Sequence, residues 1–174
     1  MDLKNPAGEY EKPAAFDANL VNRQSRQIAE FPEKLECCIS GFNQDQMSTL
    51  TLPGKWTVAQ VVHHLADSHM NALLRLKLAL TEDNPSIKPY PEWLWAELAD
   101  GINPDVGPSL EILRGIHRRF SQVLDSVDET SASRTYYHSE LQRKVPVYEI
   151  PALYSWHGMH HLAHIELLKK DRGW

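Results

Sequence analysis

The sequence lacks several features that define common protein classes. Its only two cysteines, Cys37 and Cys38, are adjacent, so they cannot form the disulfide framework of a small secreted domain. The most apolar stretch, Ala72–Leu80, is interrupted by two basic residues and is too short to span a membrane. Residues 1–13 contain no apolar region of a signal peptide. We therefore expect a soluble protein of the cytoplasm that is not exported.

Charge and composition narrow the function further. There are 18 Lys and Arg residues against 23 Asp and Glu residues, so no net basic field attracts a nucleic-acid backbone. The 42% hydrophobic content is typical of a globular chain, and the length suits a single domain over residues 1–174. Adjacent cysteines lack the spacing of a thiolate metal site, so we expect both to be reduced packing residues.

The spacing of apolar residues predicts an all-α protein. Thr57 and Gln60 match the capping-box pattern, which is the clearest helix start in the chain. Pro32 is expected to break or kink the first helix. Residues 92–98 suit one or two helical turns, and residues 134–147 suit a short hairpin before the last helix. The long helices are expected at about residues 17–39, 57–82, 109–127 and 148–170, and they predict a four-helix bundle.

Histidines are concentrated on two of these helices. On the last helix, His157 and His161 lie one turn apart, a spacing at which two ring nitrogens can bind one metal ion. His160 and His164 have the same spacing on a neighbouring face, so the sequence leaves open which pair points inward. The second helix carries three further histidines, which are His63, His64 and His69.

The second helix indicates where a further ligand could lie. The stripe through His64 includes Gln60, Ser68 and Asn71, which are uncharged, and this favours an inward polar site over a solvated face. The stripe through His63 is apolar and predicts core packing.

Two other histidines are expected outside the site. His69, on the second helix, lies on neither stripe and is expected to be exposed or at the rim of the polar site. His117, on the third helix, is expected in solvent because its neighbours Arg114 and Arg118 are charged.

Spacing excludes some metal architectures. No Glu precedes a histidine by three residues, and no His-Glu-x-x-His motif occurs, so di-iron and zincin sites are absent. A three-histidine site suits Zn²⁺, Ni²⁺, Co²⁺ or Fe²⁺ and leaves a coordination position open for water or a thiol. Because a histidine must be neutral to bind a metal, we expect affinity to fall below about pH 6.5.

Four segments carry a family resemblance. They are WTVAQVVHHLADSHMNALLR from Trp56, KLALTED ending at Asp83, IKPYPE ending at Glu92, and WHGMHHLAHI from Trp156. This sequence resembles the YfiT-like branch of the DinB superfamily over most of its length. The resemblance implies a bundle of up-down-down-up topology with a metal site formed by His64, His157 and His161. It also implies a cytoplasmic metal-dependent hydrolase, often a homodimer, that contains zinc or nickel.

Several functions remain open. The leading hypothesis is a hydrolase whose metal activates water toward a small-molecule substrate, with Asp67 as orienting group or base and Arg75 as a binder of an anionic group such as a carboxylate. The alternative is a thiol-dependent S-transferase that uses bacillithiol or a similar thiol, as related members of the superfamily do. A second alternative is a non-catalytic metal-binding bundle, in which Asp67, His160 or His164 would supply a fourth ligand. The last is that the histidines bind no ion.

Overall fold

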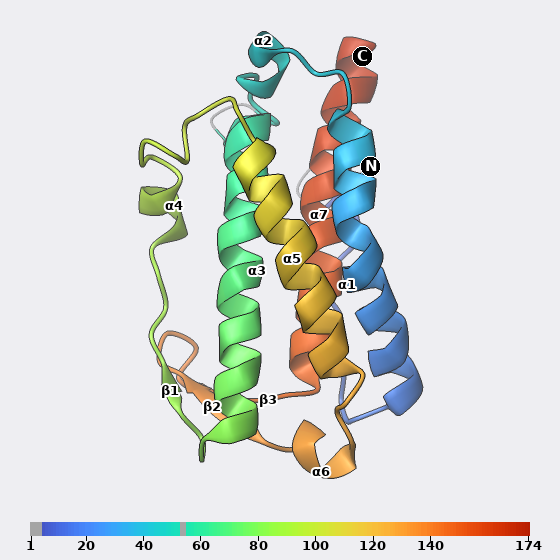
Figure 1. Cartoon of the computed structure of the whole chain (residues 1–174), viewed down its shortest axis with the longest axis vertical. Coiled ribbons are helices and arrows are strands. Elements are labelled where there is room, and N and C mark those ends of the chain that lie inside the picture. The colour runs from blue at the N-terminus through green and yellow to red at the C-terminus, as the bar shows by residue number, and fades with distance from the viewer. Residues whose placement is uncertain (1–4, 53–54) are drawn as a thin grey trace.

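The computed structural model describes residues 5–52 and 55–174 and has the predicted bundle of four long helices. In chain order these helices run up, down, down and up, as Figure 1 shows. The expectation of an all-α bundle of up-down-down-up topology is therefore confirmed. The four helices are α1 (Ala18–Ile39), α3 (Val58–Thr81), α5 (Gly107–Leu124) and α7 (Glu149–Arg172).

The topology determines which helices can share a site. Helix α1 packs against α5 and α7, and α3 packs against the same two helices from the other side. The parallel pair α3 and α5 needs a long connection, which returns along the bundle as residues 82–106 (Figure 1). Helices α3 and α7 are antiparallel neighbours, so residues near the middle of each can face one another.

Local sequence signals explain most of the helix starts. Thr57 caps α3: its side chain accepts from the Gln60 amide at 3.2 Å, and the Gln60 side chain accepts from the Thr57 amide at 3.0 Å. Asp17 caps α1 in a similar way. Helix α5 begins two residues before Ser109, with Pro108 in its first turn.

Pro32 was expected to break or kink the first helix, and the structure shows that it does not break α1. The helix continues through it from Ala18 to Ile39. A proline has no N–H, so the carbonyl of Ile28 loses its usual helical donor. Nδ1 of His117 on α5 donates to that carbonyl instead. The prediction that His117 is solvated is therefore also wrong: its side chain is fully buried, where it replaces the bond that Pro32 removes.

Short elements lie at both ends of the bundle and, for α4, along its side (Figure 1). The predicted hairpin is present as β2 (Thr135–His138) and β3 (Arg143–Pro146). A third strand, β1 (Ser86–Ile87), pairs in parallel with β2 and was not predicted. Single helical turns form α2 (Gln44–Met47), α4 (Glu92–Trp95) and α6 (Glu129–Ala132).

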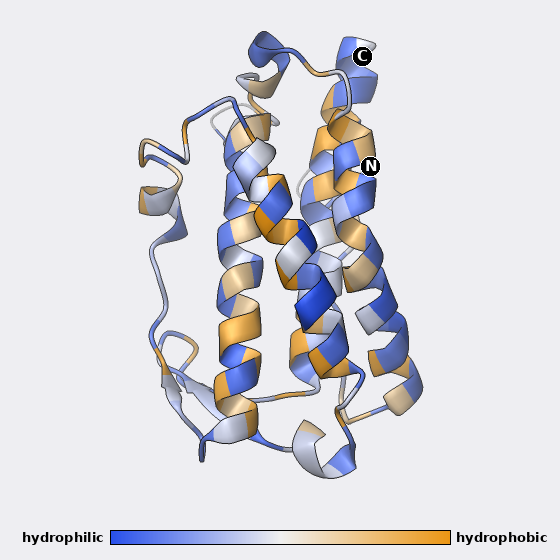
Figure 2. Ribbon diagram, viewed as in Figure 1, coloured by the Kyte–Doolittle hydropathy of each residue, from blue (hydrophilic) through white to orange (hydrophobic). Residues whose placement is uncertain are grey.

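The apolar core has two parts. One part surrounds Leu35 and Leu65 toward the α2 end, and the other surrounds Leu76 and Phe120 toward the sheet. Figure 2 shows apolar and polar residues recurring in bands along the long helices. Within the described residues, no helix is both long and apolar enough to cross a membrane. Along their helices, His69, His157, His160 and His161 lie between the residues of the two parts, whereas His63, His64 and His164 are level with the first part.

Candidate metal centre

Three ring nitrogens converge between α3 and α7. Nε2 of His157 lies 3.2 Å from Nε2 of His64 and 3.2 Å from Nε2 of His161. One ligand atom from each of these histidines lies within 4.8 Å of the others, the only such group of three found in the described residues. The sequence left open which pair on α7 points inward, and the structure turns His157 and His161 toward His64.

Hydrogen bonding alone does not account for this arrangement. A ring nitrogen carries either one proton or one lone pair, so Nε2 of His157 can form one N–H···N hydrogen bond. That bond can be made with Nε2 of His64 or with Nε2 of His161, and the other nitrogen is then left without a partner at Nε2 of His157. Two nitrogens bound to one zinc ion in tetrahedral geometry lie about 3.4 Å apart, given bonds of about 2.1 Å. The observed 3.2 Å is close to that value. The donor set therefore fits one divalent transition metal ion.

The electrostatics keep these rings neutral. Burial lowers the pKa of His64 to about 4. Burial, reinforced by the neighbouring imidazoles, lowers the pKa values of His157 and His161 well below the ordinary value. Each ring is therefore a free nitrogen donor at neutral pH. The expected loss of affinity below about pH 6.5 used the pKa of an exposed histidine. In the folded protein, where burial lowers these pKa values, protons compete with a metal ion for the imidazole nitrogens only at lower pH.

His69 was expected at the rim, and the structure corrects this. Its side chain is fully buried, and its Nε2 lies 3.3 Å from Nδ1 of His157. Its ring stacks on that of His117 at 4.7 Å and faces Phe31 at 5.9 Å. Neither of the two stripes expected to be buried includes His69, but α3 packs against α5, α7 and β2, so its buried surface extends beyond those stripes. His69 thus contacts the ring nitrogen of His157 that points away from the convergence.

The second histidine pair on α7 opens onto a pocket. Nε2 of His160 lies 3.3 Å from Nε2 of His164, and Trp156 stacks on His160 at 4.7 Å. The pocket has a volume of about 710 Å³ and also borders His161 and Trp56. The ring of Trp56 lies 4.6 Å from that of His64. A small molecule in this pocket would therefore reach the edge of the three-histidine cluster.

The proposed polar helpers lie along α3. Asp67 is half-buried, and within the described residues its side chain makes no hydrogen bond to the three converging histidines. Burial, together with the charge of Asp100, raises its pKa, while His63 opposes the shift. Arg75 lies farther along the helix and donates from Nη1 to the hydroxyl of Tyr154 at 3.3 Å. Neither side chain binds the imidazoles directly.

Sequence reasoning missed Tyr154, whose ring lies 6.0 Å from that of His157 and 5.1 Å from that of His69. It precedes His157 by three residues, and this helical spacing was the available signal. His63 is buried as its apolar stripe predicts, with Nδ1 at 2.8 Å from the Ser109 hydroxyl and Nε2 at 2.8 Å from the Asn103 carbonyl. It therefore lies outside the cluster.

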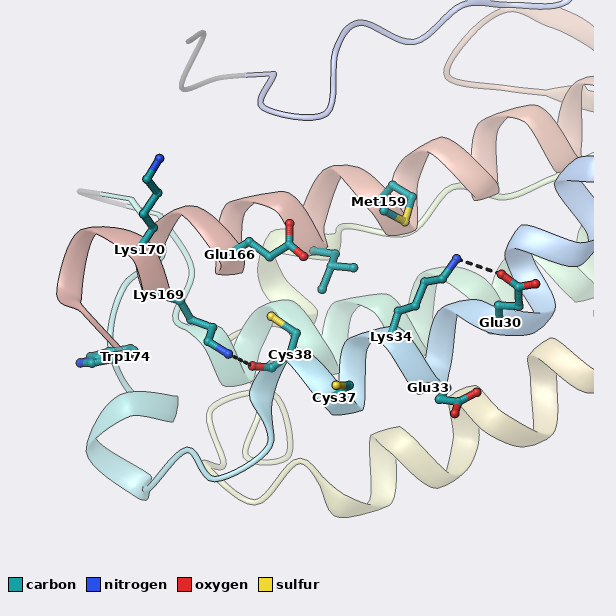
Figure 3. A pocket seen from close by; sticks show the side chains of 11 residues that line it. Glu30, Glu33, Lys34, Cys37, Cys38, Met159, Glu166, Lys169, Lys170 and Trp174 are labelled. Carbon is teal, nitrogen blue, oxygen red and sulfur yellow. Dashed lines mark hydrogen bonds and ion pairs between the residues drawn. The ribbon is translucent and has the colours of Figure 1, made fainter.

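The cysteines lie in a different groove. Figure 3 shows this groove between α1 and α7, where Lys169 donates to the Cys38 carbonyl and Lys34 pairs with Glu30. No histidine lines it. Cys37 is exposed rather than packed, which corrects the sequence expectation, whereas Cys38 is partly buried. The groove contributes nothing to the three-histidine cluster.

Comparison with known proteins agrees with the fold. The family model of the DinB superfamily matches residues 27–165. The chain belongs to the DinB superfamily. A relative from Geobacillus thermodenitrificans is 43% identical to this DinB chain over 172 residues, covering 99% of the chain and 97% of the relative. YfiT from Bacillus subtilis is 37% identical over 174 residues, covering 100% of the chain and 98% of YfiT. Both relatives carry the name "Putative metal-dependent hydrolase".

Solved structures of DinB-like fold extend the comparison. The structure of YfiT from Bacillus subtilis, described as having an unusual four-helix bundle topology, matches with a TM-score of 0.96, covering 100% of this chain and 99% of YfiT. The mycothiol-dependent maleylpyruvate isomerase matches with a TM-score of 0.65 at 17% identity, over 86% of this chain and 61% of the isomerase. The second match shows a shared fold alone.

Proposed function

We propose that this chain is a metal-dependent hydrolase in which His64, His157 and His161 hold one divalent transition metal ion, zinc or nickel. The observation that carries the proposal is the pair of 3.2 Å contacts at Nε2 of His157, which a shared cation accounts for and a hydrogen bond does not. The names of the relatives at 37–43% identity support the same reaction class.

An open coordination position distinguishes a catalytic site from a structural one. Within the described residues, no fourth His, Cys, Asp or Glu joins the group of three. Asp67, His160 and His164 were the candidates for closing the site, and the non-catalytic alternative needs one of them. A metal held by three protein ligands lowers the pKa of a bound water or thiol and so supplies the nucleophile at neutral pH.

The chain's own residues would admit the substrate and move its protons. The pocket beside His161 and Trp56 is large enough for a small molecule. Asp67 is one turn beyond His64 on α3, and its raised pKa brings it closer to the neutral range in which a general base works. We assign Asp67 the role of accepting the proton that the nucleophile releases.

The test compares metal-loaded and chelator-treated protein on a panel of esters, amides and other small electrophiles, each with and without a thiol. We expect hydrolysis by the loaded protein without thiol, and its loss after chelation. Turnover that strictly needs a thiol would instead assign the chain to the S-transferase alternative. No turnover under any condition, with a full metal complement, would favour the non-catalytic bundle.

A variant pair separates the base from the metal. Asp67→Asn should lower kcat by about 10²-fold to 10⁴-fold without changing the metal content. Lys77→Met is the control, because Lys77 is an exposed residue of the same helix. Unchanged kcat in Asp67→Asn would remove Asp67 from the mechanism.

A further inference from the structure

Arg75 carries a positive charge that its surroundings leave uncompensated. Within the described residues, no carboxylate lies within the 4.0 Å of an ion pair, and its one hydrogen bond runs from Nη1 to Tyr154. Nε is buried without a partner, although the residue as a whole is partly exposed. A buried donor left unpaired destabilises the folded state. Such a cost points to a partner that the chain itself does not supply.

The groups around Arg75 are mostly neutral donors. Burial raises the pKa of Tyr90 to about 12 and also raises those of Tyr136 and Tyr154, so all three keep their hydroxyl protons at neutral pH. The charge of Arg75 opposes the shift in each case. It also helps to lower the pKa of His138, after the larger effect of burial. Two carboxylates also act on these hydroxyls: Asp67 raises the pKa of Tyr90, and Glu149, which pairs with Arg143, raises that of Tyr136. Within the described residues, neither forms an ion pair with Arg75.

The cluster is continuous with the three-histidine centre. Tyr154 accepts from Arg75 at 3.3 Å, and its ring lies 6.0 Å from that of His157. Because Nη1 donates to Tyr154, the guanidinium edge formed by Nε and Nη2 remains available to a ligand. That edge presents two parallel N–H groups, the geometry that matches the two oxygens of a carboxylate.

We propose that Arg75, with the hydroxyl of Tyr154, binds a carboxylate group of the substrate, whose reactive end lies at the three-histidine centre. This inference rests on the proposed function and adds the substrate class: a small molecule with a carboxylate several bonds away from the group that reacts. The exposed part of Arg75 gives the anion its approach, and Tyr154 lies between the two ends of the substrate.

The test uses thiol acids of increasing chain length. Protein loaded with Co²⁺ is titrated with mercaptoacetate, 3-mercaptopropionate and longer homologues, and with the matching mercaptoalcohols. The dissociation constant comes from the thiolate-to-cobalt charge-transfer absorption. We expect one chain length at which the acid binds about 10-fold to 100-fold more tightly than its alcohol, since hydrogen bonds to charged groups are the strong ones.

Variants then assign the preference to Arg75. Arg75→Met and Arg75→Gln should remove the preference for the acid and leave the alcohol unchanged. Lys77→Met is the control, because Lys77 is an exposed cation on the same helix and should not affect the preference. The difference between acid and alcohol binding is first measured on the wild-type protein, so this part of the test holds even if an Arg75 variant fails to fold.

The outcomes separate the two proposals. Acids and alcohols that bind equally at every length would overturn the carboxylate site and leave the open metal site intact. A preference that survives in both Arg75 variants would also overturn it. If the protein binds Co²⁺ but no thiol of either series changes its spectrum, the open position is absent, and the proposed function fails together with this inference.

Discussion

Replacing His69 should weaken metal binding even though His69 is not in the three-histidine cluster. When His157 binds a metal through Nε2, its proton lies on Nδ1, and Nε2 of His69 is 3.3 Å from that atom. His69 then accepts this hydrogen bond and fixes both the tautomer and the ring orientation of His157. Removing the acceptor leaves a buried N–H unpaired beside the metal.

The size of the effect follows from comparable contacts. Loss of a partner that orients a metal-binding histidine typically weakens affinity by about 10-fold to 100-fold, or about 1.4–2.8 kcal/mol. His69→Phe keeps an aromatic ring against His117 and Phe31 but removes the acceptor. His69→Gln offers an amide oxygen near the position of Nε2, so we expect it to recover most of the affinity.

The assay is competition for Zn²⁺ against a chromophoric chelator, with unfolding measured separately on each metal-free protein. His63→Gln is the matched control and should bind as the wild type does. Wild-type affinity in His69→Phe would refute the reasoning. So would equal weakening in the Phe and Gln variants, because the loss would then follow from altered packing rather than from the missing acceptor.

Two further predictions concern stability. Burial lowers the pKa of His117 to about 4, below its ordinary value in the unfolded chain, so the stabilisation that neutral His117 gives is present above about pH 6.5 and lost as the pH falls toward 4. Between pH 7 and pH 5 we expect His117→Gln, which can still donate to the Ile28 carbonyl, to lose about 2 kcal/mol less unfolding free energy than the wild type in urea titrations; equal losses would contradict this. A Cβ on Gly158 would lie 2.9 Å from the Phe31 ring, whereas one on Gly115 would meet nothing within 4 Å. Gly158→Ala should therefore destabilise the fold by about 1–3 kcal/mol and Gly115→Ala should stabilise it by up to about 1 kcal/mol, as measured by thermal unfolding; a stabilising Gly158→Ala would contradict the packing argument.

The elements predicted well from sequence are those with local causes. The side chains of Thr57 and Gln60 each accept a hydrogen bond from the other residue's backbone N–H within one turn. The start of α3 can therefore be predicted without knowing the rest of the fold. Strand β1 was missed because its two residues form a strand only by pairing with β2, some fifty residues later. The burial of His117 was missed for a similar reason, because it depends on a carbonyl that Pro32 frees on another helix.

The candidate site was only partly predictable. Helical spacing identified the two histidine pairs on α7, but the rotation of α7 decides which pair faces α3, and that rotation depends on packing between helices. The polar stripe selected His64 because most of the residues in it are uncharged, although it also contains Asp67 and Arg75. His69 was misplaced because it belongs to neither of the two stripes that were expected to be buried, whereas α3 is buried at His69 as well. Tyr154 and its contact with Arg75 depend on two helices whose facing sides the sequence does not determine.

The most direct test of the metal site is elemental analysis of the purified protein after saturation with Zn²⁺ or Ni²⁺ and removal of excess ion. We predict one metal ion per chain in the wild type and in His63→Gln, and a loss of stoichiometric binding in His64→Ala, His157→Ala and His161→Ala. Metal content that is unchanged in all three variants, or a wild-type protein that retains no ion, would contradict the assignment of these histidines as ligands.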